Sequence, residues 1–238
     1  MILIDEWQAR SVLNQREATK EQSRQKIVEA AAAQFAANGY EGTSFASIAA
    51  AMNRPKSAIG YHLFPSKMDL AVSVIEQQQA RWVQMEACVR EPAGLGHLIT
   101  MLLSSCVDAL DCPVAAGAIR LSHEFWQTGR PLPRTFKWGP YAKRQFAVAR
   151  SLPIYDSEVA RAADLLLAST FGVMWAQTSV RLPRETERQL RDLWVALCLG
   201  IGVSDAQEIV ARVKPVEVRI PTSCRSDSAF QGGSCASS

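Results

Sequence analysis

Two helix breaks lie close together in residues 53–70, NRPKSAIGYHLFPSKMDL, and they limit the folds open to this chain. Asn53 and Pro55 interrupt a helical pattern, and Pro65 interrupts it again. Proline suits the first turn of a helix but not its interior, so the pattern predicts a very short helix over about 55–62. Two short helices joined by a tight turn, with a third packed behind, form a helix-turn-helix, whose second helix enters a DNA major groove.

Helical periodicity continues on the N-terminal side of this segment. A first helix is expected over about Lys20–Asn38, because Thr19 and Gln22 form a capping box and Gly39 stands where a left-handed C-cap is wanted. A second helix, Phe45–Met52, with Ser44 or Thr43 as its cap, carries one apolar stripe at helical spacing. These two helices provide the support and the first half of the predicted motif.

The rest of the chain also reads as helices, and no segment alternates convincingly as a strand does. A loop rich in proline and glycine, TGRPLPRTFKWGP, interrupts the pattern once. The small, polar and helix-breaking residues from Lys214 onward predict a mostly disordered tail. The fold class is therefore all-α, with further helices expected at about 67–89, 95–110, 113–128, 138–150, 156–180 and 184–202, and a final turn or two after 202.

Composition sets the class of protein but not its function. The 238 residues can bury a sizeable core, and the formal net charge is only +3. No stretch reaches the roughly 18 to 20 apolar residues of a membrane span, and the start of the chain lacks the features of a signal peptide, so a cytosolic protein is expected. The six cysteines form no CxxC pair or zinc-ligand spacing, which predicts free thiols and no metal site. The three histidines are scattered and no HExxH, GxSxG, P-loop or GxGxxG motif occurs, so neither catalytic residues nor a cofactor are expected.

The exposed side of the short helix is where base contacts are expected. Lys56, Ser57 and His62 lie on or near that side, and Tyr61 can donate its hydroxyl to a phosphate while its ring packs inward. A small helical subdomain with surface lysines is the alternative reading of the same residues.

The next helix is expected to begin at a second DNA contact. Ser66 and Asp69 form a capping box that starts this helix at Lys67, where a helix N-terminus and a full positive charge would together bind a phosphate. The residues expected at the DNA are Thr43, Ser44, Arg54, Lys56, Ser57, Tyr61, His62 and Lys67.

The run IVEAAAAQFAANGYEGTSFASIAAAMNRPKSAIGYHLFPSKMDLA resembles the N-terminal DNA-binding domain of the TetR family of bacterial transcription regulators. The marks are a helix ending in FAANGY, TS opening the second helix, and GYHLFPSKMDL, which is similar to the family's string of tyrosine, two bulky residues, phenylalanine and xSKxxL. Lys56, Ser57 and Gly60 depart from the residue types usual in the family, so the base preferences of relatives are not carried over.

The resemblance implies an all-helical homodimer whose C-terminal domain holds a small-molecule pocket. Two long helices of that domain would pair with their twofold mates, and VARAADLLLASTFGVMWAQTSV and ERQLRDLWVALCLGIG are the candidates. A large internal core is the alternative explanation for their apolar character. The implied organisation is an N-terminal arm (1–18), a helix-turn-helix domain (19–66), a ligand-binding and dimerisation domain (67–213) and the tail (214–238).

Within the family, CPVAAGAIRLSHEFWQTGRPLPRTFKWGPY resembles the corresponding stretch of the γ-butyrolactone receptor group of actinobacterial regulators. On this match Trp138 takes the place of that group's pocket tryptophan, and a plain core aromatic is the alternative. A lactone ring on an alkyl chain needs an apolar slot and a few donors aimed at its oxygens. The residues expected at this pocket are Gln79, Trp82, Ser122, Phe125, Trp126, Trp138, Thr170 and Trp175.

The function expected from these features is that of a repressor released by its ligand. Its partners would be double-stranded operator DNA, a second copy of the chain and a small effector such as a γ-butyrolactone or butenolide, with no membrane. The same fold sensing an antibiotic, a drug or a fatty acyl ligand, or acting without a ligand, is the alternative. An enzyme is the rival class of protein, and the absence of these catalytic motifs disfavours it.

Overall fold

The computed structural model describes residues 2–59, 63–133, 136–176 and 183–216. All regular elements in these ranges are helices, so the all-α prediction is confirmed. Most helices expected after residue 90 begin and end within two residues of their predicted bounds. The elements are α1 (Ile2–Asn38), α2 (Phe45–Ala51), the 3-10 helix η1 (Lys56–Ile59), α3 (Lys67–Cys88), α4 (Leu95–Asp111), α5 (Pro113–Gln127), α6 (Trp138–Arg150), α7 (Ser157–Ala176), α8 (Pro183–Gly200) and α9 (Ala206–Arg212).

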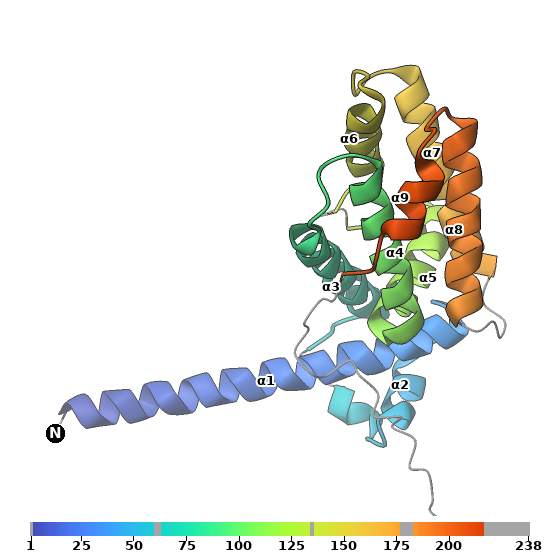
Figure 1. The fold of residues 1–238 in the computed structure, drawn as a ribbon. Coiled ribbons are helices and arrows are strands. Elements are labelled where there is room, and N and C mark those ends of the chain that lie inside the picture. Colours follow the sequence, from blue (N-terminus) through green and yellow to red (C-terminus); the bar gives the residue numbers. More distant parts are fainter. Residues whose placement is uncertain (1, 60–62, 134–135, 177–182, 217–238) are drawn as a thin grey trace, which may run out of the picture.

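Helix α1 is much longer than predicted and projects from the body of the molecule (Figure 1). The predicted start at Lys20 and the predicted capping box at Thr19 and Gln22 are wrong, because the helix runs through them from Ile2. The Thr19 hydroxyl donates instead to the carbonyl of Gln15 one turn earlier (2.8 Å), as threonines inside helices do. Residues 2–18 contain neither glycine nor proline, so nothing in the expected arm interrupts the helix.

The turn between α1 and α2 follows the predicted capping. Gly39 adopts φ 71°, and its N–H donates to the carbonyl of Phe35 (2.9 Å), which closes α1 with a left-handed residue. Ser44 is the N-cap of α2, and its hydroxyl accepts from the backbone N–H of Ser47 (3.1 Å). The α1–α2 angle is therefore set by local hydrogen bonds.

The turn between the two short helices closes on an asparagine. Asn53 takes φ 51°, and the N–H of Arg54 donates to the carbonyl of Ala49 (3.0 Å), which completes a Schellman-type end for α2. The predicted α-helix over 55–62 is only partly right, since Lys56–Ile59 form a 3-10 helix and residues 60–62 lie outside the described ranges. Hydrogen bonding between residues three apart suits so short a run between breakers.

The molecule has two hydrophobic cores, and helix α3 contributes buried residues to both. The first core, which we call the head core, joins α1, α2, η1, the start of α3 and α5, and includes Phe35, Ile48, Phe64 and Phe125. The second core, the effector-domain core, joins the end of α3 with α4 and α6–α9. Packing is continuous across residues 66 and 67, because α3 runs from one core into the other.

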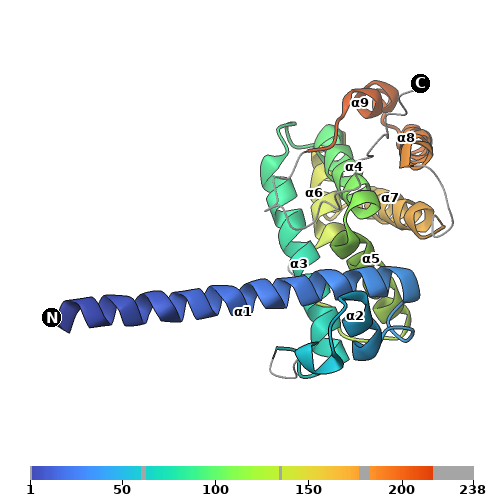
Figure 2. The same cartoon turned by 90° about the horizontal axis from the view of Figure 1, so that it is seen from below.

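Helix α5 packs so closely on α1 that one position must be glycine. A Cβ atom on Gly117 would lie 2.4 Å from the backbone carbonyl oxygen of Ala32, so any side chain there would push the two helices apart. Figure 2 shows α5 lying over the C-terminal half of α1. The DNA-proximal part of the fold is therefore completed by a helix from far along the chain.

Candidate DNA-binding surface and ligand site

The surface of α2 and η1 carries part of the predicted DNA-contacting set. Ser44, Arg54 and Ser57 are exposed, as that prediction requires. The side chain of Lys56, and the whole of Tyr61 and His62, lie outside the described part of the structure. DNA contact by these residues stays a prediction.

Thr43 is not placed for DNA contact. Its side chain is buried, and its hydroxyl donates to the carbonyl of Gly39 (2.7 Å), inside the α1–α2 turn. The prediction fails because the residue before an N-cap can face the core as well as the solvent. Thr43 thus stabilises the turn, while its neighbour Ser44 caps the helix.

Lys67 holds the head together in this structure. Its ammonium group donates to the carbonyls of Tyr40 (2.8 Å) and Thr43 (3.1 Å) and lies 4.2 Å from the centre of the Tyr40 ring. Two of its three donors are therefore used by the α1–α2 turn. A phosphate contact, which stays a prediction, would have to use the third donor or replace one of these carbonyls.

Two residues of α5 that the sequence did not single out complete the end of α1. Arg120 donates to the carbonyls of Ala36 (2.8 Å) and Ala37 (2.9 Å), and Glu124 accepts from the backbone N–H of Tyr40 (2.7 Å). Their i, i+4 spacing was the available signal, because such a pair often forms an ion pair on one helix face, as here (3.1 Å). The pair satisfies backbone groups that a helix end leaves without partners.

A second tie joins the head to the loop before α6. Arg130 donates to Glu41 (2.7 Å) and lies 4.5 Å from the centre of the Tyr40 ring. The hydrogen bond from Arg130 lowers the pKa of the Glu41 carboxyl below its usual value. Burial raises the pKa of Tyr40, which keeps its hydroxyl protonated at neutral pH.

Four aromatic residues pack against one another between α3 and α6. Trp82 from α3 lies 5.5 Å from Trp138, and Phe136 lies 5.0 Å from Trp138, measured between ring centroids. Tyr141 closes the group, 5.3 Å from Phe136 and 5.8 Å from Trp138. We call Trp82, Phe136, Trp138 and Tyr141 the aromatic cluster.

The aromatic cluster contains buried donors without acceptors. The indole N–H groups of Trp82 and Trp138 and the hydroxyl of Tyr141 have no hydrogen-bond partner among the described residues. Burial raises the pKa of Tyr141, so its hydroxyl keeps its proton and can donate. Buried polar groups are nearly always paired in folded proteins, so three such donors around one apolar group mark a place where an acceptor can bind.

Gln79 lies one turn before Trp82 on α3 and holds the segment that carries the cluster. Its side-chain amide donates to the carbonyl of Pro133 and accepts from the backbone N–H of Phe136 (3.4 Å). The loop before α6 is therefore fixed to α3 directly. Gln79, Trp82 and Trp138 are brought together as the sequence predicted.

The other predicted pocket residues lie elsewhere. Phe125 is fully buried in the head core, apart from the aromatic cluster, where it packs edge-on against Tyr40 (5.1 Å). Trp126, one position on, is 72% exposed, and a pocket role for either residue stays a prediction. Trp175 stacks on His123 (3.9 Å) at the surface between α5 and α7.

Thr170 and Ser122 are also apart from the aromatic cluster. The Thr170 hydroxyl donates to the carbonyl of Leu166 (2.7 Å) and accepts from the indole N–H of Trp194 (2.8 Å), so it satisfies a core tryptophan. Ser122 is half-buried on α5, a helix that mainly completes the head. The apolar pattern of the sequence indicates which helices are buried, but it does not show which of them pack next to one another.

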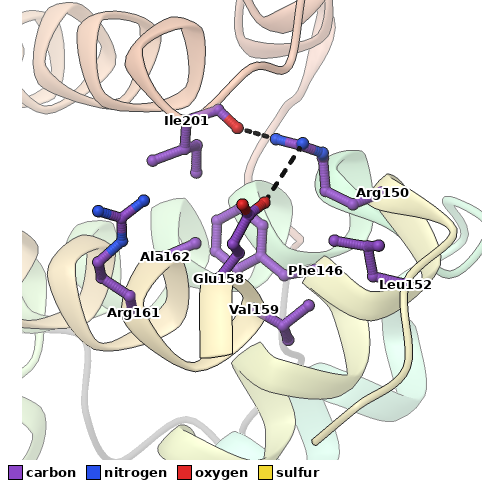
Figure 3. Close-up of a pocket in the computed structure, with 8 residues that line it drawn as sticks. All are labelled: Phe146, Arg150, Leu152, Glu158, Val159, Arg161, Ala162 and Ile201. Atoms are coloured by element: carbon purple, nitrogen blue, oxygen red, sulfur yellow. Dashed lines mark hydrogen bonds and ion pairs between the residues drawn. The ribbon is translucent and has the colours of Figure 1, made fainter. Parts of the chain in front are cut away.

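Two hollows in the described structure are poorly suited to an effector. Figure 3 shows a cavity of about 20 Å³ where Arg150 donates to the carbonyl of Ile201 and pairs with Glu158 (3.8 Å), and it has room for about one water molecule. A groove of about 570 Å³ between Cys88 and Lys214 is open, and charged side chains line much of it. The aromatic cluster is the better candidate, since it combines an apolar wall with buried donors that have no acceptor in the described structure.

The comparisons with known proteins decide the family. Residues 27–74 match the family model of bacterial regulatory proteins of the tetR family. The structure of the TetR-family protein CprB from Streptomyces coelicolor, solved in complex with its biological operator sequence, is similar at 28% sequence identity. That match covers 81% of this chain and 94% of CprB, with a TM-score of 0.63. Residues 27–74 therefore form a DNA-binding domain of the tetR family, and the chain is similar in fold to TetR-family regulators.

Two further solved structures are similar in fold to this chain. A γ-butyrolactone receptor described as ArpA-like is 24% identical, with a TM-score of 0.65 over 82% of this chain and 97% of that one. TylP, a TetR regulator from Streptomyces fradiae, is also 24% identical, with a TM-score of 0.55 over 82% and 92% of the two chains. No curated protein sequence matches the chain. The matching family model and the CprB structure are those of DNA-binding regulators and not of enzymes.

The prediction that no apolar stretch is long enough to span a membrane needs correction. Helix α7 is 20 residues long with a mean hydropathy of 1.3, enough by length and composition to cross a membrane. A third of that stretch is buried inside the fold, and core helices of soluble proteins pass the same test. The unburied remainder includes Leu165, Phe171 and Trp175, which are partly exposed.

Proposed function

We propose that this regulator is a repressor that binds a pseudo-palindromic operator as a homodimer and is released by a γ-butyrolactone or butenolide. The observation that supports the ligand class most directly is the aromatic cluster with its three donors lacking acceptors in the described structure. A lactone ring supplies oxygen acceptors, and its alkyl chain supplies apolar surface for the rings of Trp82, Phe136 and Trp138. Because the rings are in contact in this structure, the ligand binds by separating them.

Helices α7 and α8 support the homodimer. Leu165 and Phe171 on α7 and Leu199 on α8 are each at least 40% exposed, although the opposite faces of both helices are buried. Large apolar side chains exposed on neighbouring helices favour an interaction surface there. Pairing these two helices with their twofold mates would cover these side chains and place the two short helices η1 about 34 Å apart, one turn of DNA.

Helix α3 supports a route from ligand to DNA. Its first residue, Lys67, is bonded to the α1–α2 turn, and Trp82 and Gln79 near its far end contact the aromatic cluster and its loop. A ligand that separates Trp82 from Trp138 moves α3, and with it the head. The ligand then favours a spacing of the two heads that does not match the operator, and a coupling of about 1 to 3 kcal/mol weakens DNA binding roughly 5- to 150-fold.

Substitution of Trp138 tests this proposal. Trp138→Ala should leave operator affinity unchanged and abolish release by a γ-butyrolactone, because the wall and one donor of the site are lost. Trp126→Ala, which removes a tryptophan exposed outside the cluster, is the matched control and should keep normal release. Fluorescence anisotropy of a labelled operator, titrated with a panel of γ-butyrolactones and butenolides, measures both quantities. Normal release from Trp138→Ala would rule out the proposed site.

A further inference from the structure

The N-terminal part of α1 stands clear of the rest of the molecule. Residues 15–22 are all exposed, and from residue 15 onward the first buried position of the helix is Ile27. At 1.5 Å per residue, the stretch from residue 2 to residue 24 extends about 33 Å. Both views show it pointing away from α7 and α8, which lie on the opposite side of the molecule (Figures 1 and 2).

One face of this projecting stretch is basic. Arg16, Lys20 and Arg24 follow one another at intervals of four residues, so their side chains form a single stripe. Like charges at this spacing repel one another, and an anion beside them lowers that repulsion. Within the described part of the chain, neither Arg16 nor Lys20 has an ion-pair partner.

An acidic stripe runs beside the basic one. Glu17 and Glu21 are rotated by about 100° from Arg16 and Lys20 respectively, and each lies about 60° from the next basic residue along the helix. The two stripes are equally exposed and have the same spacing. The chain therefore offers its own matched control for any test of the basic residues.

The contacts of Arg24 show which way the basic stripe faces. Its guanidinium lies 4.7 Å from the centre of the Phe64 ring and donates to the hydroxyl of Ser73 on α3 (3.0 Å). Phe64 comes directly after the candidate recognition segment, so Arg24 lies at the edge of the helix-turn-helix. Lys20 and Arg16 carry the same stripe about 6 and 12 Å further outward.

We infer that Arg16 and Lys20 bind the phosphate backbone of the operator duplex just outside each half-site. This inference rests on the proposed function, since it needs a dimer on DNA whose two heads are related by a dyad near α7 and α8. Because α1 points away from that dyad, each basic stripe reaches over the outer flank of the site and not over its centre. An offset of about 12 Å from Arg24 corresponds to three or four base pairs at 3.4 Å each.

Such contacts make affinity depend on the length of the duplex but not on the flanking sequence. Phosphate contacts carry no sequence information directly, and each lowers the salt slope of binding by about 0.9. Two residues in each protomer give four contacts in the dimer, so the flanks should account for a slope of roughly 3 to 4. Between 50 and 200 mM salt, the advantage of a flanked duplex should then shrink by roughly 100-fold.

The experiment compares two duplexes bound by the full chain. One is the operator core, selected from a random pool, and the other is the same core with ten arbitrary base pairs added at each end. The wild type should bind the flanked duplex roughly 100-fold more tightly at 50 mM salt, and this advantage should nearly vanish at 200 mM. Arg16→Ala combined with Lys20→Ala should bind both duplexes equally and match the wild type on the core, while Glu17→Ala combined with Glu21→Ala should keep the advantage.

The outcomes separate this inference from the proposed function. If the wild type gains nothing from the flanks, or the basic double variant keeps the gain, the inference is wrong even though operator binding stands. If the chain does not select an operator core at all, the proposed function fails with it. Alanine preserves helicity, and circular dichroism of each variant checks that α1 is intact. Arg16→Glu with Lys20→Glu provides a second test, for which the flanked duplex should bind less tightly than the core.

Discussion

The head core and the effector-domain core treat their buried polar groups in opposite ways. In the head, the Thr43 hydroxyl, the Lys67 ammonium and the Tyr40 backbone N–H all have partners. Every buried side-chain nitrogen or oxygen without a partner in the described ranges lies between residues 77 and 186, beyond the predicted helix-turn-helix domain. In the described ranges, every buried side-chain nitrogen and oxygen before residue 67 thus has a partner, whereas several such atoms after it, His123 on α5 among them, have none.

This difference indicates that the head is already stabilised by its own hydrogen bonds, whereas the aromatic cluster can gain hydrogen bonds from a ligand. A buried polar group without a partner costs about 1 to 3 kcal/mol, so the aromatic cluster and its surroundings carry a stability cost that the head does not. A ligand that accepts hydrogen bonds from Trp82, Trp138 and Tyr141 removes that cost. Ligand binding should therefore stabilise the effector domain and leave the internal geometry of the head unchanged.

The largest expected effect distinguishes two adjacent aromatic residues. Phe125→Ala should destabilise the protein by about 3 to 5 kcal/mol, because it empties a fully buried site in the head core. Trp126→Ala should change the free energy of unfolding by less than about 0.5 kcal/mol, because that side chain is exposed. Urea unfolding followed by circular dichroism measures both. Similar losses from the two variants would mean that α5 does not complete the head core.

A smaller effect is expected where α5 meets α1. Gly117→Ala should cost about 1 to 3 kcal/mol, because its methyl group would press on the backbone of Ala32. Gly139→Ala, where nothing lies within 4 Å of the added atom, is the control and should be close to neutral. The shift in thermal midpoint measures both effects. If Gly117→Ala had no effect, α1 and α5 would have to lie further apart than they do in this structure.

The helix ends of the head could be predicted from the sequence, because their causes are local. Gly39, Ser44 and Ser66 each cap a helix through bonds to residues within four positions. The start of α1 could not be predicted from such signals, because a capping pattern at Thr19 is equally compatible with the middle of a helix. A sequence pattern identifies where a helix can start but not that it does.

The pocket residues were harder to predict because they depend on which elements pack together. Phe125 shares one face of α5 with Leu121 and Ala118, and all three lie in the head core. Trp126 is rotated by about 100° from Phe125, so the two could never line one wall, and helical geometry alone contained that information. Tertiary packing turns this face of α5 toward α1, and no local pattern in the sequence indicates it. The same holds for the bonds of Lys67 to two backbone carbonyls.

A pair of threonines tests the two cores directly. Thr43→Val should destabilise by about 1 kcal/mol or more, because it removes a bonded hydroxyl and leaves the Gly39 carbonyl without that donor. Thr100→Val should be neutral or slightly stabilising, because the Thr100 hydroxyl is buried with no partner in the described chain. The two substitutions are chemically identical, so equal effects in chemical denaturation would contradict the contrast between the cores.

The smallest expected effect concerns the exposed tie between the head and the loop before α6. The folded-state pKa of Glu41 is lowered by Arg130, so the pair adds stability above the ordinary carboxyl pKa and loses it as the pH falls through the lowered value. The thermal midpoint of the wild type should exceed that of Glu41→Gln at pH 7, and the gap should close in acid. Since the Glu41 side chain is 77% exposed, salt should also narrow the gap, and a gap that persists in acid would exclude this pair as its cause.

The most direct test of the account observes the indole N–H groups while the ligand acts. Uniformly ¹⁵N-labelled protein gives one indole signal for each tryptophan, and Trp→Phe variants assign them. Adding a compound that releases the operator should shift the signals of Trp82 and Trp138 together, because their open donors gain an acceptor. The signal of Trp194, already bonded to Thr170, should move little. Release of the operator with the Trp82 and Trp138 signals unmoved would contradict the account.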